Sequence, residues 1–147
     1  MSDANNNNSL HQRPNRWPLA VVTGAASGIG ACFAEQLRQQ GYRLLLVDIC
    51  GSRLSSLRES LENAGDANTP PIECCTFDLT DRMSVEALSS RLEEEPHVDL
   101  LVNNAGFGSL EEFTAVDVDV HRRMIALHVE TPMLLIHAVL PRMKRIN

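Results

Sequence analysis

Apolar residues recur along the chain in two alternating patterns, one typical of strands and one typical of helices. Four short and nearly continuous apolar runs predict buried strands: Leu19–Thr23, Tyr42–Val47, Ile72–Phe77 and Val98–Val102. Apolar residues at helical spacing predict helices over Gly28–Gln40, around Leu54–Leu61, around Val85–Leu92 with an end near Pro96, and from about Asp117 towards Lys144. Ile29, Phe33 and Leu37 mark one face of the first of these helices.

Strands that alternate with helices predict an α/β fold, a doubly wound parallel sheet with helices on both faces. Right-handed crossovers leave few topologies, and the strand order 3-2-1-4 is the one we expect. The polar residues 1–16 precede the first strand and are expected to form a disordered tail.

A glycine-rich turn, Thr23–Gly30, follows the first strand and opens the first helix. Ligands of doubly wound sheets lie at the carboxyl ends of the strands, where this turn is expected. Gly24 permits a sharp turn, Gly28 lets the backbone approach a bulky anion, and Gly30 lets the helix pack closely on the strand. The N–H groups that open the helix would then hold a pyrophosphate.

Asp48 adds a carboxylate at the end of the second strand, where it can accept hydrogen bonds from both hydroxyls of a ribose. By itself Asp48 is explained equally well as a helix N-cap or a turn residue. Together, the strand, glycine turn, helix and terminal acid predict that residues 17–147 form a dinucleotide-binding domain of the Rossmann type.

The composition and charge of the chain indicate which kinds of partner it can bind and where in the cell we expect it. The chain has 147 residues, 44% of them hydrophobic, and a formal net charge of −6. This charge argues against nucleic-acid and anionic-membrane surfaces, which need clustered Lys and Arg. No apolar run predicts a membrane span of about 20 residues, and the N-terminus lacks the apolar core of a secretory signal, so we expect a cytoplasmic protein.

The four cysteines and five histidines lack the spacing of a metal site, so no metal is expected. The cysteines are expected to act as small buried hydrophobic residues: Cys32, Cys50, Cys74 and Cys75.

Three segments resemble motifs of the short-chain dehydrogenases/reductases. "TGAASGIG" is similar to the cofactor motif of that family, "FDLTD" to its adenine-contacting segment, and "LLVNNAG" to its most distinctive non-catalytic motif. The three occur in the order of the family and near its spacing, and the resemblance extends from Leu19 to the end of the chain. It implies an NAD(P)-dependent oxidoreductase that transfers hydride between nicotinamide and an alcohol or carbonyl substrate.

The resemblance also implies roles for individual residues. The residues expected to line the pyrophosphate are Gly24, Ser27, Gly28, Ile29 and Gly30. Asp48 would hold the adenosine ribose, while Asp78 by its side chain and Leu79 by its backbone would contact adenine. Asn104 would approach the cofactor ribose, and Asn103 would brace neighbouring strands. For Asp78 a cap of the helix near residues 80–82 is the structural alternative.

The groups that perform the chemistry in this family are a serine after the fifth strand and a Tyr-x-x-x-Lys on the next helix. The only tyrosine of this chain is Tyr42, and the residue four positions on is Leu46. We therefore expect the chain alone to be inactive, as the cofactor-binding part of an oxidoreductase truncated after the fourth strand and helix. The alternative is a non-catalytic or degenerate dinucleotide-binding protein.

The residues around Asp48 predict the cofactor preference, and the long helix and the fourth strand predict the oligomeric state. Asp48 would repel a 2′-phosphate and is followed by Ile49 rather than a basic residue, so we expect NAD(H) to be preferred over NADP(H). Arg53 is near enough for a compensating contact. Members of the family commonly dimerise through the long helix, which predicts a homo-oligomer. An open apolar edge at the fourth strand predicts aggregation or ill-defined oligomers instead.

His128 occupies the position at which the family usually has an asparagine, whose backbone carbonyl binds a water linked to the catalytic lysine. Pro132 has no N–H to donate to the carbonyl of His128, so we expect the helix to bend and that carbonyl to be released. His128 is then expected on the face towards Asn104–Gly106, with its carbonyl turned to the cofactor cleft. The alternative is a buried histidine beside an incidental kink.

Overall fold

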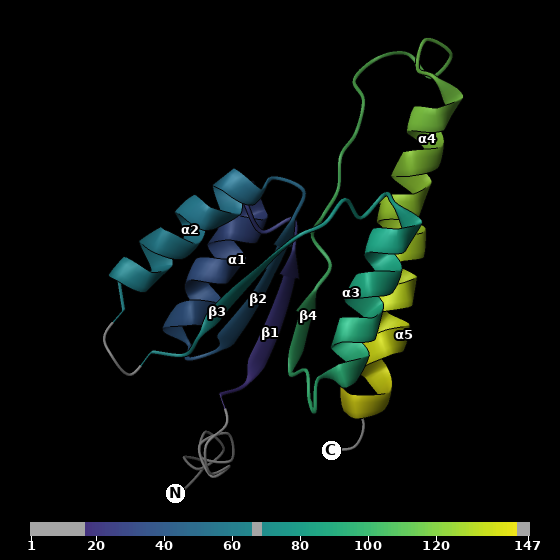
Figure 1. The fold of residues 1–147 in the computed structure, drawn as a ribbon. Coiled ribbons are helices and arrows are strands. Elements are labelled where there is room, and N and C mark those ends of the chain that lie inside the picture. Colours follow the sequence, from purple (N-terminus) through teal and green to yellow (C-terminus); the bar gives the residue numbers. More distant parts are fainter. Residues whose placement is uncertain (1–16, 66–68, 144–147) are drawn as a thin grey trace, which may run out of the picture.

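The computed structural model describes residues 17–65 and 69–143 (Figure 1). Its strands are β1 (Leu19–Thr23), β2 (Arg43–Asp48), β3 (Ile72–Thr76) and β4 (Leu100–Val102). Its helices are α1 (Gly28–Gln39), α2 (Gly51–Asn63), α3 (Arg82–Glu94), α4 (Val118–Ile125), the π-helical η1 (Ala126–Glu130) and α5 (Thr131–Met143). The tail expected at residues 1–16 lies outside the described residues.

The four strands form one sheet in the order β3-β2-β1-β4, and every neighbouring pair is parallel. The predicted doubly wound α/β fold and its strand order are therefore confirmed. All four strands end at the same edge of the sheet, so the segments that follow β1, β2, β3 and β4 meet there.

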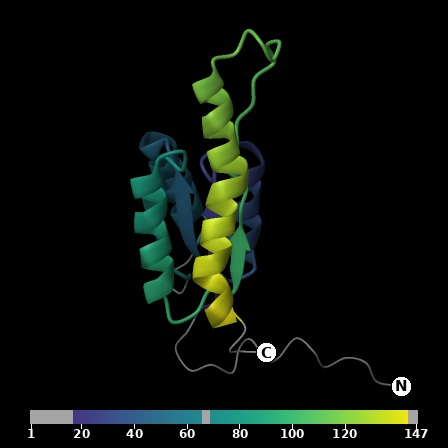
Figure 2. The ribbon, with the colours of Figure 1, turned by 90° about the vertical axis from the view of Figure 1, so that its right-hand side faces the viewer.

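Alternate residues of the strands supply two separate cores. Val21 and Leu45 pack with residues of α3 and α5, while Val22 and Leu46 pack with residues of α1 and α2. Figure 1 shows the corresponding layers, with α1 and α2 against one face of the sheet and α3 and α5 against the other. Figure 2 shows α3 and α5 side by side, and α4 extending beyond the sheet.

The first helix buries a different face from the predicted one. Gly30, Ala34 and Leu37 are buried, whereas Ile29 is 69% exposed and Phe33 is 41% exposed. Side chains as small as those of Gly30 and Ala34 let the helix lie close to the sheet, so the contact follows the small residues rather than the large apolar ones.

The prediction of buried cysteines is wrong. Cys32 is exposed, and the other three are half-buried and free. Cys74 and Cys75 lie on β3, the outer strand of the sheet, where the covering layers end. Burial still raises the pKa of the Cys74 thiol above its ordinary value. Among the described residues, no group of three or more His, Cys, Asp or Glu could hold a metal ion.

The long helix begins close to its predicted start: Asp117 is its N-cap, and the carboxylate of Asp117 accepts from the N–H of Asp119 at 2.7 Å. It continues without interruption from Val118 to Met143 through the π-helical turn η1. Within this turn the N–H of Thr131 donates to the carbonyl of Ala126, five residues earlier. The bend of the helix axis expected from Pro132 stays a prediction, and the π-helical turn lies just before that proline.

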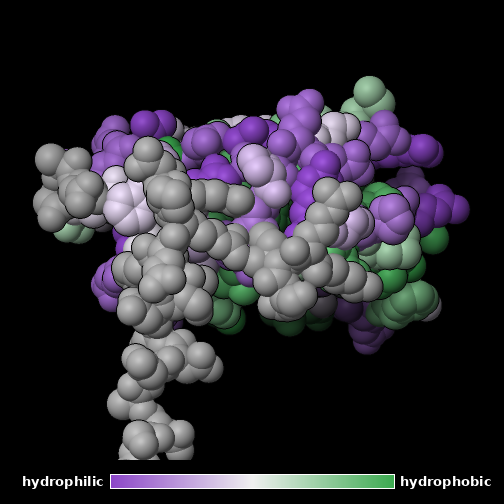
Figure 3. Space-filling view, turned by 90° about the horizontal axis from the view of Figure 1, so that it is seen from below, coloured by the Kyte–Doolittle hydropathy of each residue, from purple (hydrophilic) through white to green (hydrophobic). Residues whose placement is uncertain are grey.

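The same helix bears on the sequence-based conclusion that no apolar run could span a membrane. By length and composition alone, Val118–Met143 would suffice to cross a membrane, with a mean hydropathy of 1.5 over 18 residues. Leu135, Ala138 and Val139 of this helix are buried in the core against the sheet and α3, although only 28% of the apolar window is buried. Hydrophobic residues remain at the surface on the side of the long helix (Figure 3), among them Met133, Ile136 and Leu140.

A hydrogen-bonded clip joins β1 to β4 at the amino ends of the strands. The carboxylate of Asp99 accepts from the N–H of Leu19 at 2.7 Å and lies 2.6 Å from Nε2 of His97. The N–H of Asp99 in turn donates to the carbonyl of Leu19 at 2.9 Å. One side chain therefore fixes the start of the central strand and a histidine that is only 4% exposed.

Asp99→Ala is expected to lower the free energy of unfolding by about 3 kcal/mol, because two partly buried donors lose a charged acceptor. Urea unfolding would measure the loss. Glu62→Ala is the matched control, since it removes an exposed carboxylate whose ion pair with Arg58 is worth about 0.5 kcal/mol or less. Equal stabilities of the two variants would contradict this account of the clip.

Candidate dinucleotide-binding site

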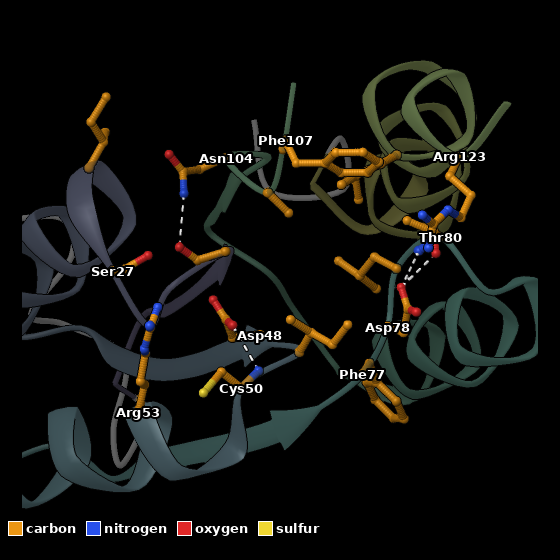
Figure 4. Close-up of a pocket in the computed structure, with 17 residues that line it drawn as sticks. Ser27, Asp48, Cys50, Arg53, Phe77, Asp78, Thr80, Asn104, Phe107 and Arg123 are labelled. Carbon is orange, nitrogen blue, oxygen red and sulfur yellow. Dashed lines mark hydrogen bonds between the residues drawn. The ribbon is translucent and has the colours of Figure 1, made fainter. Parts of the chain in front are cut away.

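A cleft of about 580 Å³ lies at the carboxyl ends of the strands. The segments that follow all four strands line it, together with residues of the long helix (Figure 4). Seven of the predicted site residues are among its lining: Gly24, Ser27, Ile29, Asp48, Asp78, Leu79 and Asn104. Gly28 and Gly30 lie in the first turn of α1 and are not among the lining residues.

The glycine turn is shaped by backbone conformation and by close packing. Gly24 and Gly28 have φ angles of 64° and 54°, in the left-handed region that favours glycine. A Cβ on Gly24 would lie 2.7 Å from Cα of Ala105, and one on Gly30 would lie 2.0 Å from the carbonyl oxygen of Gly24. A Cβ on Gly28 would meet no atom within 4 Å. Gly24 and Gly30 thus fit the turn against its neighbours, while Gly28 faces open space.

The start of α1 fits an anion. Ser27 is the N-cap residue, but its side chain makes no capping hydrogen bond. Its hydroxyl and the first N–H groups of a 12-residue helix therefore remain to bind a ligand, at the positive end of the helix dipole. With the open space over Gly28, these groups have the size, charge and donors that a pyrophosphate requires.

Asp48 holds the turn and also faces the cleft. One carboxylate oxygen accepts from the N–H of Ala26 at 3.0 Å, and the other accepts from the N–H of Cys50 at 2.9 Å. The residue that caps α2 is Cys50, so the N-cap alternative for Asp48 is wrong, while its use in a turn is correct. Each carboxylate oxygen has a second lone pair, which leaves room for two further donors.

Thr23 and Asn104 join the glycine turn to the segment after β4. The hydroxyl of Thr23 accepts from the N–H groups of Asn104 and Ala105 at 3.0 and 3.1 Å. The side-chain amide of Asn104 donates to the carbonyls of Thr23 and Gly24 at 3.1 and 3.0 Å. The bracing role expected of Asn103 thus belongs to Asn104, because side chains alternate in direction along the segment and Asn103 is exposed.

Sequence reasoning missed Thr23, although it is 2% exposed and central to this network. A threonine that ends a strand is common for its β propensity alone, so the sequence carries no separate signal for its hydroxyl.

Asp78 forms a local turn beside the cleft. One of its oxygens accepts from the N–H of Thr80 at 2.9 Å and from the hydroxyl of Thr80 at 2.7 Å. The cap of α3 is Asp81, which accepts from the N–H of Ser84 at 2.9 Å, so the capping alternative for Asp78 is wrong. Hydrogen bonds from the N–H and hydroxyl of Ser84 hold the pKa of Asp81 below its ordinary value.

The far wall of the cleft includes two residues that sequence reasoning did not name, Phe107 and Arg123. The guanidinium of Arg123 lies 5.9 Å from the centre of the Phe107 ring, a cation–π distance. Arg123 lies four residues before Leu127, which also lines the cleft, so helical spacing would have been the signal for it.

His128 lies on the helix face that was predicted. Its Cε1 would be 2.6 Å from a Cβ on Gly106, and its Nε2 is 2.7 Å from the carbonyl oxygen of Phe107. A carbonyl only accepts, so Nε2 carries the proton of this hydrogen bond. The alternative of a buried histidine is wrong, because His128 is exposed. The direction of its own carbonyl stays a prediction.

Arg53 and Cys50 lie at the other end of the cleft, on the side of α2. In Figure 4 Arg53 extends from α2 along the same side of the cleft as Ser27 and Asp48. The hydroxyl of Ser52 and the backbone N–H of Arg53 lower the pKa of the Cys50 thiol. A thiol and a guanidinium therefore line the cleft on the same side as Asp48.

Comparisons with known proteins place this geometry in a family. The family model described as short chain dehydrogenase matches residues 18–147. An uncharacterised oxidoreductase of Staphylococcus saprophyticus is 35% identical over 126 residues, which is 85% of this chain and 53% of that protein. The chain thus spans about half the length of this curated relative.

Two solved structures have the same architecture. One is the bulky-bulky ketone specific alcohol dehydrogenase from Comamonas testosteroni, 31% identical, with a TM-score of 0.80 over 87% of this chain and 50% of that one. The other is a short-chain dehydrogenase from Sphingobium yanoikuyae in complex with NADPH, 32% identical, with a TM-score of 0.81 over 87% of this chain and 49% of that one. From its fold, its cleft and the family match over residues 18–147, the chain belongs to the short-chain dehydrogenase family.

Proposed function

We propose that this chain is the dinucleotide-binding part of an oxidoreductase that moves hydride between a nicotinamide cofactor and an alcohol or carbonyl substrate. One observation carries the proposal. The uncapped start of α1 and the carboxylate of Asp48 face one cleft and are joined by the hydrogen bond from Ala26 to Asp48. The solved relative from Sphingobium yanoikuyae, which was obtained with NADPH, supports it.

In this proposal each part of the cleft holds one part of the cofactor. The N–H groups of Gly28, Ile29 and Gly30 and the hydroxyl of Ser27 bind the pyrophosphate, and Gly24 shapes the turn. Asp48 accepts from the hydroxyls of the adenosine ribose. The segment of Asp78 and Leu79 receives adenine, and Asn104 lies beside the second ribose.

The bound nicotinamide supplies the hydride chemistry, while His128 acts on the chain itself. By donating to the carbonyl of Phe107, His128 holds the segment after β4 in its place beside the cleft. A cytoplasmic location and a homo-oligomer through the long helix stay predictions. A non-catalytic dinucleotide-binding protein is the remaining alternative for the chain.

The chain is expected to bind NAD(H) about tenfold or more tightly than NADP(H). The Asp48 carboxylate is fixed by two backbone N–H groups and cannot turn away from the second phosphate. Titration calorimetry with both nucleotides tests the binding and the preference together. No binding of either nucleotide would refute the proposed function, and tighter binding of NADP(H) would refute only the preference.

Two variants separate the charges near the adenosine ribose. Asp48→Asn keeps the size of the side chain but removes its charge, so the preference for NAD(H) should shrink. Arg53→Gln removes the one cleft-lining cation on the side of α2 and should weaken NADP(H) binding while leaving NAD(H) binding within about twofold.

A further inference from the structure

A buried threonine connects the long helix to the segment expected to contact adenine. Thr131 is the first residue of α5 and is 4% exposed. Its hydroxyl donates to the carbonyl of Leu79 at 2.8 Å, across 52 residues of sequence. A helical threonine can instead bond a carbonyl of its own preceding turn, and here the hydroxyl reaches another segment.

The π-helical turn brings this contact about. It ends at Glu130, so Thr131 follows directly after the widened turn, and His128 lies within it. From this one part of the helix, His128 bonds the carbonyl of Phe107 after β4 and Thr131 bonds the carbonyl of Leu79 after β3. Side chains of η1 and α5 thereby hold both segments that line this side of the cleft.

We propose that Thr131 is a positioning residue for adenine recognition: by tethering the carbonyl of Leu79 to the long helix, it keeps the carboxylate of Asp78 in place as the acceptor for the amino group of the base. This inference rests on the proposed function. Adenine carries an amino donor at C6, for which the carboxylate of Asp78 is the proposed acceptor. Leu79 directly follows Asp78, so the hydrogen bond from Thr131 restrains the backbone beside that carboxylate.

The hydrogen bonds of Asp78 determine which of its two carboxylate oxygens is available to the base. One carboxylate oxygen already accepts from the N–H and the hydroxyl of Thr80. In the described part of the chain, the other oxygen accepts no hydrogen bond, and Asp78 lines the cleft. An ionised carboxylate only accepts, so it favours the amino group of adenine and repels the carbonyl oxygen that hypoxanthine has at the same position.

The test compares NAD+ with nicotinamide hypoxanthine dinucleotide, which differs from it only in the base. The wild-type chain should bind NAD+ more tightly. Thr131→Val should reduce this ratio of affinities about fivefold, the effect of one lost hydrogen bond. Without the hydrogen bond to the carbonyl of Leu79, the carboxylate of Asp78 is held less firmly and discriminates less between the two bases. Thr131→Ser keeps the hydroxyl and should keep the ratio.

Two further variants separate positioning from stability. Val139→Ala creates a cavity in the same helix but keeps the hydroxyl of Thr131 that bonds Leu79, so it should lower the melting temperature and leave the ratio unchanged. Asp78→Asn can present an amide donor to the base and should therefore invert the preference towards hypoxanthine. This second test does not depend on whether Thr131→Val folds.

The outcomes distinguish the two proposals. Failure of the wild-type chain to bind either dinucleotide would overturn the proposed function, and the role of Thr131 with it. Binding of NAD+ with the same base preference in wild type and Thr131→Val would overturn only the role of Thr131. A preserved adenine preference in Asp78→Asn would do the same.

Discussion

Gly30→Ala is expected to abolish dinucleotide binding and to lower the free energy of unfolding by about 3 kcal/mol or more. The new Cβ would lie 2.0 Å from the carbonyl oxygen and 2.8 Å from the carbonyl carbon of Gly24, and 2.6 Å from the side-chain nitrogen of Asn104. Two of these three atoms are backbone and belong to the turn that shapes the cleft. The clash cannot be relieved without moving Gly24 and breaking the hydrogen bonds of Asn104.

Two other glycines provide controls for this prediction: Gly28 for the loss of stability, and Gly108 for both stability and binding. Gly28→Ala meets no atom within 4 Å but keeps a φ of 54°, so it should cost only about 1 kcal/mol of backbone strain. Gly108→Ala has neither a clash nor a positive φ and should be neutral. Urea unfolding and nucleotide titration of the three variants measure the difference. Gly30→Ala binding NAD+ within twofold of wild type would show that the packing argument is wrong.

The 147-residue chain is expected to bind dinucleotide without turning over alcohols or ketones. General acid–base catalysis by a positioned side chain contributes about 10²–10⁴-fold, and correct positioning of the reactants contributes more. The one tyrosine in the sequence, Tyr42, directly precedes β2 and therefore lies at the amino ends of the strands. The cleft lies at the carboxyl ends, so Tyr42 cannot reach a substrate that is held there.

An assay of reduced nicotinamide absorbance with a panel of alcohols and ketones should match the rate without protein. Nucleotide titration of the same preparation guards against a trivial result from unfolded chain. Turnover that is lost in Gly30→Ala would be turnover at the cleft and would contradict the prediction. Turnover that persists in Gly30→Ala would point to a contaminating enzyme.

The sequence was most informative where the local pattern and the global fold agree. The inner strands β1 and β2 are buried on both faces, so their apolar runs are continuous and identify them without tertiary information. Crossover handedness then fixed the order β3-β2-β1-β4. The sequence was less informative for α1, because the helix approaches the sheet through Gly30 and Ala34 and leaves the larger Ile29 and Phe33 exposed.

The same contrast holds for the candidate site. The glycines and Asp48 could be named from the sequence because strand ends of a parallel sheet meet at one edge. Asp78 and Asn104 were named because their motifs resemble those of the family. The hydrogen-bond partners of these side chains could not be predicted from the sequence. Asn104 rather than Asn103 braces the glycine turn, and Asp81 rather than Asp78 caps α3.

By itself, then, the sequence determined the parallel sheet, its strand order and the edge at which the cleft lies, because these depend on hydrophobic periodicity and on short motifs at strand ends. Only the tertiary structure decided which side chains connect those ends. The hydroxyl of Thr23 meets N–H groups 81 and 82 residues away, and that of Thr131 meets Leu79 across 52 residues. A hydroxyl carries no periodicity of its own, so its partner is fixed only when packing brings distant segments into contact.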